Sequence, residues 1–306
     1  MKKETIKIVL GYTLISILWG TTWYAIRIGL NSLTPIFAAG LRFTTASIFI
    51  YAIMRYSGAR LQTDKLSLIL YVAMGFFSFV IPFGLVYWGE QYVSSGLTSV
   101  LFGSFPFFVI LFSRFAFPNE KIGILKLLGV VLAFIGIVVI FFDSLSFTKN
   151  NLLIGMIAVV SSAALQGAIA VVIKKWGNHL HSLSMNFIPL VIAGITMLLF
   201  GLLFEDRTKW DFNSSAILSV LYLALFGTVF TFTTYYWLMK KIDVVILSLS
   251  SFITPIIALI VGSVLLAEHL SFLNFIGSSL VLVGILFANL RGLIKYYSQK
   301  QKLEIN

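Results

Sequence analysis

The 306-residue sequence contains no cysteine, and only 11% of it is Asp, Glu, Lys or Arg. The absence of cysteine excludes disulfides, thiol catalysis and iron–sulfur ligation. The low charge excludes a water-soluble globular fold, because a soluble domain carries about 25% charged residues. The three histidines, His179, His181 and His269, lack metal-ligand spacing, so we expect neither a metal nor a cofactor.

Hydrophobic residues make up 59% of the chain and gather in long runs. About 20 apolar residues cross a bilayer as a helix, and these runs lack the strict alternation of barrel strands. We therefore predict an all-α polytopic membrane protein with ten transmembrane helices. The predicted spans are residues 8–30, 35–55, 66–89, 94–117, 122–142, 152–174, 183–204, 214–238, 243–266 and 271–290.

The second half of the chain repeats the first. Pro106 and Pro255 each lie within an apolar span and are 149 residues apart, and Glu120 and Glu268 follow them at a spacing of 148. In each half the next span then carries two glycines seven residues apart, namely Gly129 and Gly136, and Gly277 and Gly284. This duplication predicts two five-helix repeats, residues 1–146 and 147–306.

The basic residues predict the orientation of the spans. If both termini are cytoplasmic, 17 of the 22 Lys and Arg residues face the cytoplasm and 3 face outside, while Arg27 and Arg42 lie within spans. The net charge of +11 therefore indicates membrane topology, and we expect no nucleic-acid partner. Five spans per repeat place the two halves in opposite orientations. Such inverted repeats are typical of secondary transporters, which bind substrate between the halves near the midplane.

Several motifs occur in a characteristic order. The first span holds the sequence WGTTWY at residues 19–24, the second holds Leu41-Arg42-Phe43, and each proline span is followed by a glutamate and a glycine-containing span. Together these motifs resemble the EamA-type permeases of the drug/metabolite transporter superfamily over nearly the whole chain. The resemblance implies a ten-helix bundle in the cytoplasmic (inner) membrane. It also implies a carrier that usually exports amino acids, metabolites or toxic compounds.

Arg42 is the most informative single residue. It lies about 10 Å inside the second span at 1.5 Å per residue, where a charge usually faces a cavity or a partner. It could clamp a substrate carboxylate or form half of an outer gate. Alternatively, it could make a structural ion pair or extend to the interface. Glu90, at the outer end of the third span, is the nearest acidic candidate, so we predict an Arg42–Glu90 pair that closes the outer vestibule.

Aromatic and amide side chains supply further candidates. Trp19 and Trp23 are four residues apart and share one face of the first helix. With Tyr235 they could line a cavity for a planar solute, or they could belong to the interfacial aromatic belt. Gln166 and Asn186 are isolated amides within spans, which predicts either substrate contact or hydrogen bonds between helices.

Prolines and glycines indicate where helices bend and pack. Pro106 and Pro255 predict kinked helices at matching places, which are either moving hinges or static bends. The glycine pairs predict close helix packing within the chain or, alternatively, the face of a homodimer. Glu120 and Glu268 are expected to open spans five and ten, where a carboxylate favours the helix N-terminus.

All eleven acidic residues are placed at span ends, in loops or in tails, and none of the three histidines lies in a predicted span. This predicts facilitated diffusion or exchange, unless Glu90 lies deeper and couples transport to protons. The predicted function is an alternating-access transporter for a small organic metabolite, amino acid or drug-like solute, and the family resemblance implies that it is an exporter. A membrane scaffold or receptor-like protein is the alternative. An intramembrane enzyme is not expected, because no catalytic constellation is visible, and no charged ring indicates a channel.

Overall fold

The computed structural model describes residues 2–116, 123–145, 150–239, 241, 250–269 and 271–287. These residues form helices joined by loops, with no strand among them, which confirms the all-α prediction. Seven helices of the described part are long and apolar enough to cross a membrane. Three shorter apolar helices accompany them, at Leu128–Ile140, Ile253–Leu266 and Phe272–Phe287. The chain is therefore a multi-pass membrane protein.

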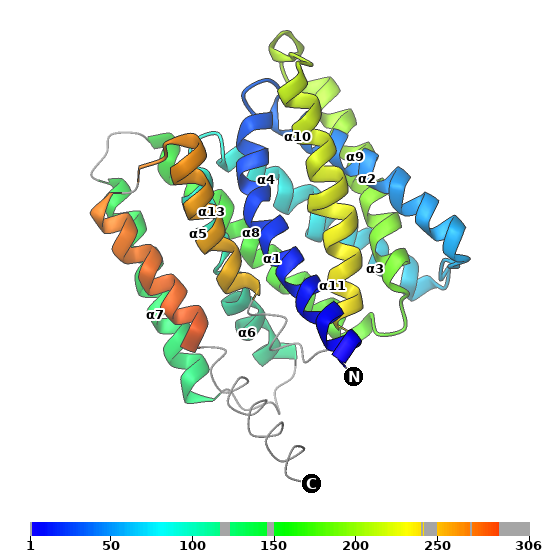
Figure 1. The fold of residues 1–306 in the computed structure, drawn as a ribbon, viewed down its shortest axis with the longest axis horizontal. Coiled ribbons are helices and arrows are strands. Elements are labelled where there is room, and N and C mark those ends of the chain that lie inside the picture. The colour runs from blue at the N-terminus through cyan, green and yellow to red at the C-terminus, as the bar shows by residue number, and fades with distance from the viewer. Residues whose placement is uncertain are drawn as a thin grey trace.

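The order of the described helices along the chain is shown by colour in Figure 1. The first half contains α1 (Lys2–Gly29), α2 (Pro35–Ser57), α3 (Lys65–Met74), η1 (Gly75–Val80), α4 (Ile81–Gly89), α5 (Ser95–Phe102), α6 (Phe105–Ala116) and α7 (Ile124–Leu145). The second half contains α8 (Asn150–Trp176), α9 (Ser182–Phe204), η2 (Arg207–Lys209), α10 (Ser214–Ala224), η3 (Leu225–Phe230), α11 (Thr231–Met239), α13 (Ser250–Leu266) and the helix Phe272–Phe287.

Two long helices each contain one π-helical segment at the same place in their half of the chain. The segment η1 joins α3 to α4, and η3 joins α10 to α11, so the two begin 150 residues apart. A π-helical segment shifts the backbone hydrogen bonds to i→i+5, and such segments are frequent at functional sites. Sequence analysis did not predict either segment.

Helices from the two halves pack in pairs that run antiparallel. A Cβ on Gly40 of α2 would lie 2.6 Å from the Leu198 nitrogen of α9, and one on Gly194 would lie 2.7 Å from the Thr44 nitrogen. Only glycine permits so close an approach between the two backbones. Residue numbers rise along α2 as they fall along α9, which establishes the antiparallel direction.

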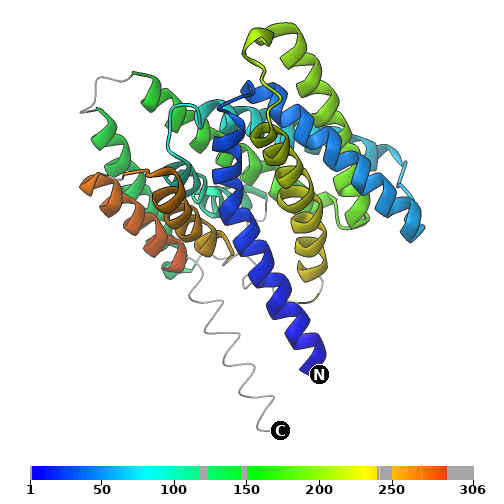
Figure 2. The ribbon, with the colours of Figure 1, turned by 45° about the horizontal axis from the view of Figure 1, so that its top comes forward.

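The predicted glycine seams pack against each other. A Cβ on Gly136 of α7 would lie 2.5 Å from the Gly277 carbonyl oxygen, and one on Gly284 would lie 2.5 Å from the Gly129 carbonyl oxygen. Both views show α7 lying beside the helix Phe272–Phe287 at one edge of the bundle (Figures 1 and 2). These glycines therefore contribute to packing within the chain.

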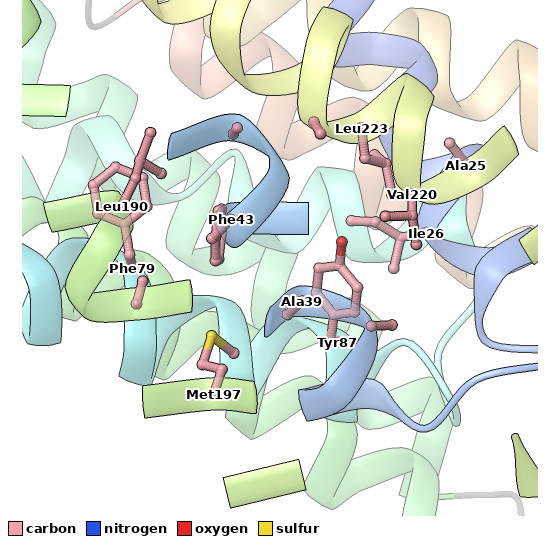
Figure 3. Close-up of a cluster of buried hydrophobic side chains, with 14 of the residues drawn as sticks. Ala25, Ile26, Ala39, Phe43, Phe79, Tyr87, Leu190, Met197, Val220 and Leu223 are labelled. Atoms are coloured by element: carbon pink, nitrogen blue, oxygen red, sulfur yellow. The ribbon is translucent and has the colours of Figure 1, made fainter. Parts of the chain in front are cut away.

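Helix α1 lies between the remaining groups of helices. It contacts α5 and α13 on one side and α10 and α11 on the other (Figure 1). The largest buried hydrophobic cluster forms where α1, α2, α4, α9 and α10 converge (Figure 3). Phe43, Tyr87 and Leu190 are fully buried within it. The centre of the molecule is thus built from both halves of the chain.

The two predicted proline bends differ. The helix that contains Pro106 is interrupted, because α5 ends at Phe102 and α6 begins at Phe105. Pro255 instead lies inside the continuous helix α13. The two sites are close in space, since a Cβ on Gly103 would lie 3.5 Å from the Pro255 Cγ. A hinge role for either proline stays a prediction.

Two glutamates bind the N-termini of helices distant in sequence. The backbone N–H groups of Ser95 and Gly96 donate to the Glu268 carboxylate at 2.7 and 3.0 Å, so Glu268 caps α5. The prediction that it serves the start of its own span is wrong, because the free N–H groups of α5 offer it a stronger site. Glu205 likewise accepts from two backbone N–H groups of α2. Glu120 lies outside the described residues.

Candidate functional site

Arg42 lies at the centre of the bundle and is only 2% exposed. Its Nε donates to the Thr228 hydroxyl at 3.0 Å, one terminal nitrogen donates to the Tyr87 hydroxyl at 3.3 Å, and the other donates to the Gly227 carbonyl at 3.2 Å. The guanidinium carbon also lies 5.1 Å from the centre of the Phe83 ring, within the range of a cation–π contact. The side chain of α2 thereby reaches both α4 and η3.

The π-helical geometry of η3 supplies two of these acceptors. Gly227 and Thr228 belong to η3, and the Thr228 hydroxyl donates in turn to the Leu223 carbonyl at 2.9 Å. The shifted backbone hydrogen bonds of a π-helical segment leave a carbonyl free for another donor. Arg42 is therefore bonded to the irregular part of the eighth predicted span.

The predicted Arg42–Glu90 ion pair is not formed. Glu90 is fully buried, and neither carboxylate oxygen has a hydrogen-bond partner. Arg27 instead donates to the main-chain oxygen of Glu90. Glu90 has α-helical backbone angles at the C-terminal end of α4, so its carbonyl is available to Arg27. The Arg42 donors are already directed toward Thr228, Gly227 and Tyr87.

The two predicted tryptophans contact different helices. The Trp19 ring centre lies 5.4 Å from that of Tyr235 and 5.8 Å from that of Phe232, both on α11. The Trp23 ring lies 5.5 Å from Phe102 of α5 and is 8% exposed, and its indole N–H has no hydrogen-bond partner. Both tryptophans therefore pack between helices, and their use by a solute stays a prediction.

The two predicted amides differ in burial. Asn186 of α9 is fully buried, and neither its amide nitrogen nor its oxygen has a partner, so the expected hydrogen bond between helices is not formed. Gln166 is partly buried on α8. Buried hydroxyls without a partner are also found at Thr44, Ser162 and Thr233. Because most buried polar groups in native proteins are satisfied, these atoms mark places where water or a solute would complete the hydrogen bonding.

The site also contains residues that sequence analysis missed. Gly227, Thr228 and Tyr87 are not among the candidates that the sequence predicts. A hydropathy pattern carries no signal for a π-helical segment, because one additional residue in a turn leaves an apolar run apolar. The 149-residue offset between the halves offered one indirect signal, since it places Tyr87 and Tyr236 at matching positions.

Charged groups outside the membrane-spanning segments have local roles. The side-chain hydroxyl and the backbone N–H of Ser67 donate to Asp64, which caps α3, and they hold the pKa of that carboxyl below its usual range. Thr208 lowers the pKa of Asp206 in the same way. Neither carboxylate belongs to the buried polar site.

The structure is a multi-pass helical membrane protein with a buried arginine and several buried polar groups that lack a partner. In membrane proteins such groups commonly mark substrate pathways. The comparisons with known proteins agree, and the chain belongs to the EamA-like transporter family, which matches residues 6–142 and 153–290. The family and the names of its relatives indicate a transporter rather than an enzyme.

Several bacterial proteins are similar to this chain over most of their length. The chain is 28% identical to "Uncharacterized transporter YoaV" of Bacillus subtilis, covering 92% of this chain and 96% of the relative. It is 30% identical to "Protein PagO" of Salmonella typhimurium, covering 84% of each. "Uncharacterized inner membrane transporter YedA" of Escherichia coli is 24% identical over 90% of this chain and 88% of the relative. One solved structure shares the fold, with a TM-score of 0.68 and 20% identity over 93% of this chain and 97% of its own.

Proposed function

We propose that the protein is an alternating-access carrier that exports a small organic solute across the cytoplasmic membrane. In this proposal ten transmembrane helices form two inverted five-helix repeats, residues 1–146 and 147–306, and both termini are cytoplasmic. The solute binds between the repeats at Arg42. Family membership supports transport, and the remaining features are supported by the contacts described next.

The pairing of helices supports the inverted repeats. Helices at matching positions of the two halves contact each other, as α2 does with α9 and α5 with α13. The close contacts of glycines along these pairs run antiparallel, as two copies of one unit in opposite orientations require. Two further sets of contacts correspond in the same way. In one, α4 of the first half packs against α8 of the second, and in the other, α10 and α11 of the second half pack against α1 of the first.

One observation carries the solute site, namely that Arg42 is buried among neutral acceptors. No ion-pair partner of Arg42 is present among the described residues, and its hydrogen bonds end on hydroxyls and a carbonyl. A buried charge without a counter-charge is costly, and buried charges in membrane proteins commonly mark substrate pathways. A solute carboxylate would neutralise the guanidinium in the bidentate geometry that arginine favours.

The experiment that tests this proposal measures thermal unfolding of the purified protein with a panel of amino acids, carboxylic acids, nucleosides, sugars and cationic drugs. A solute that binds only the folded state stabilises it by about 2.7 kcal/mol at 100 times its Kd. We expect a carboxylate-containing class to raise Tm in the wild type and in Arg55→Lys, an exposed control on α2. Arg42→Lys should lose the shift, because lysine cannot reproduce the planar fork.

Two results would contradict the proposal. If the Arg42→Lys protein keeps the full solute-induced shift, the solute does not bind at Arg42. If no solute stabilises the wild type and none is transported by proteoliposomes, the alternative of a membrane scaffold or receptor-like protein gains support.

A further inference from the structure

Glu90 is a buried ionisable residue that has no role in the proposed solute site. Glu90 directly follows the membrane-spanning segment Lys65–Gly89 and is 0% exposed. Both of its carboxylate oxygens lack a hydrogen-bond partner. The other two glutamates in the described loops are bonded, since Glu205 accepts from α2 and Glu268 accepts from α5. Glu90 therefore differs from Glu205 and Glu268, because it is buried and its carboxylate accepts no hydrogen bond.

None of the charged and titratable groups around Glu90 is bonded to its carboxylate. Arg27 of α1, Arg42 of α2, Glu268 after α13 and Tyr87 of α4 are close enough to act on it electrostatically. Arg27 is bonded to the main-chain oxygen of Glu90, and Arg42 is bonded to η3 and Tyr87. Glu268 caps α5. Arg27 and Arg42 are the cations whose attraction favours an ionised Glu90 carboxylate.

This environment disfavours an ionised carboxylate. An ion removed from water without donors carries a large desolvation cost, and such a group binds a proton instead. Burial raises the pKa of the Glu90 carboxyl, Arg27 and Arg42 act in the opposite direction, and the Glu268 carboxylate adds to the increase. Above its pKa the group can ionise only if the surrounding helices move to give it water or a cation.

We propose that Glu90 is the proton-binding site that couples this carrier to the proton gradient. In the conformation described here the carboxyl is protonated and sealed from water. When the adjacent end of the bundle opens, the O–H bond breaks, the proton passes to water, and Arg27 or Arg42 pairs with the carboxylate. The inference rests on the proposed carrier function, and it favours proton coupling over the facilitated diffusion or exchange that the sequence predicted.

The first test is infrared difference spectroscopy of the purified protein at neutral pH. We expect the wild type to show the C=O stretch of a protonated carboxylic acid and the Glu90→Gln protein to lack it. Glu205→Gln is the matched control and should keep the band, because the Glu205 carboxylate accepts three hydrogen bonds. If Glu90→Gln leaves the carboxylic-acid band intact, Glu90 is not protonated and the proposal is overturned.

The second test uses the absence of cysteine from the chain. Ser95→Cys introduces a thiol at the N-terminus of α5, where Ser95 is fully buried and its hydroxyl has no partner. Its maleimide labelling rate is divided by that of Lys209→Cys, whose native side chain is 71% exposed, and this ratio is compared with the same ratio in the Glu90→Gln background, because the two thiols ionise differently. The ratio should rise with pH by up to about tenfold per pH unit, following the ionised fraction of one group.

In the background of Glu90→Gln the labelling ratio should keep only the pH dependence of the two thiols and lose the additional rise. An equal pH dependence with and without Glu90→Gln would overturn the proposal, because another group would then control the opening. Neither test needs a solute, so their failure is distinct from failure of the carrier proposal. If both signals are present while the solute panel gives no shift, Glu90 is supported as a proton site and the solute classes of the panel are excluded.

Discussion

Arg42 and Glu90 are buried ionisable residues that are accommodated in different ways. Arg42 distributes its charge over three neutral acceptors and lies 5.1 Å from the centre of the Phe83 ring. Glu90 has no donor for its carboxylate oxygens. A guanidinium has five donors that can each find a carbonyl or hydroxyl, whereas a carboxylate needs donors. Helix interiors in a membrane offer few donors, because their backbone N–H groups are already bonded.

Asn186 provides a prediction at the scale of one residue. Because its buried amide has no partner, Asn186→Leu should raise the free energy of unfolding by about 1 kcal/mol. The same substitution should abolish the solute-induced shift in Tm if the amide binds the solute. Asn213→Leu is the control and should lower stability by about 1 kcal/mol, since Asn213 caps α10 and accepts from the Ala216 N–H. Loss of stability in Asn186→Leu would instead indicate a structural role.

At the scale of the element, the π-helical segment η3 is the feature that positions the site. It lies against α1 and α2, and its carbonyl and hydroxyl groups accept from Arg42. Gly227 is the residue that allows this approach, because a Cβ there would lie 2.8 Å from the Thr22 Cγ2 and 3.4 Å from an Arg42 nitrogen. The matching segment η1 lies against α9 in the other half.

Gly227→Ala should therefore lower the free energy of unfolding by about 1–3 kcal/mol, because the added methyl group overpacks the contact with α1. It should also weaken solute binding by displacing Arg42. Gly84→Ala is the matched control, since a Cβ there would meet its nearest atoms at 3.4 and 3.9 Å. We expect Gly84→Ala to be neutral or slightly stabilising. Chemical denaturation of both proteins checks the difference, and equal stability would contradict the packing argument.

At the scale of the whole molecule, matching helices from the two halves lie against each other. The pair formed by α7 and the helix Phe272–Phe287 stands at one edge of the bundle, beside α5 and α13 (Figures 1 and 2). Small residues allow the backbones to approach, and in a bilayer such packing replaces the hydrophobic effect as the source of helix association. The glycine contacts between these two helices therefore stabilise the packing of one half of the chain against the other.

Gly136→Ala tests this arrangement. The added methyl group would lie 2.5 Å from the Gly277 carbonyl oxygen, so we expect stability to fall by about 1–3 kcal/mol while the mass of the particle stays the same. Val138→Ala is the control on the same helix, and it should have little effect because Val138 is 50% exposed. Thermal unfolding and light scattering measure the two properties. A change in mass without a change in Tm would indicate a dimer face instead.

The sequence by itself determined that the chain is a multi-pass helical membrane protein of the EamA type. Apolar run length is a local property, and the duplicated proline and glycine motifs can be read without knowing which helices meet. Arg42 could be identified for the same reason, since a charge within an apolar run is visible in one segment. Burial of Glu90 could be stated only as an alternative, because it depends on the helices around the end of α4.

Only the tertiary structure decided which groups the charged side chains bond. It placed Arg42 on Gly227 and Thr228 rather than on Glu90, and it placed Glu268 on α5 rather than on its own span. Each of these hydrogen bonds joins residues more than 170 positions apart in the chain. Which acceptor a buried donor finds depends on the packing of whole helices, and on a π-helical segment that hydropathy does not reveal.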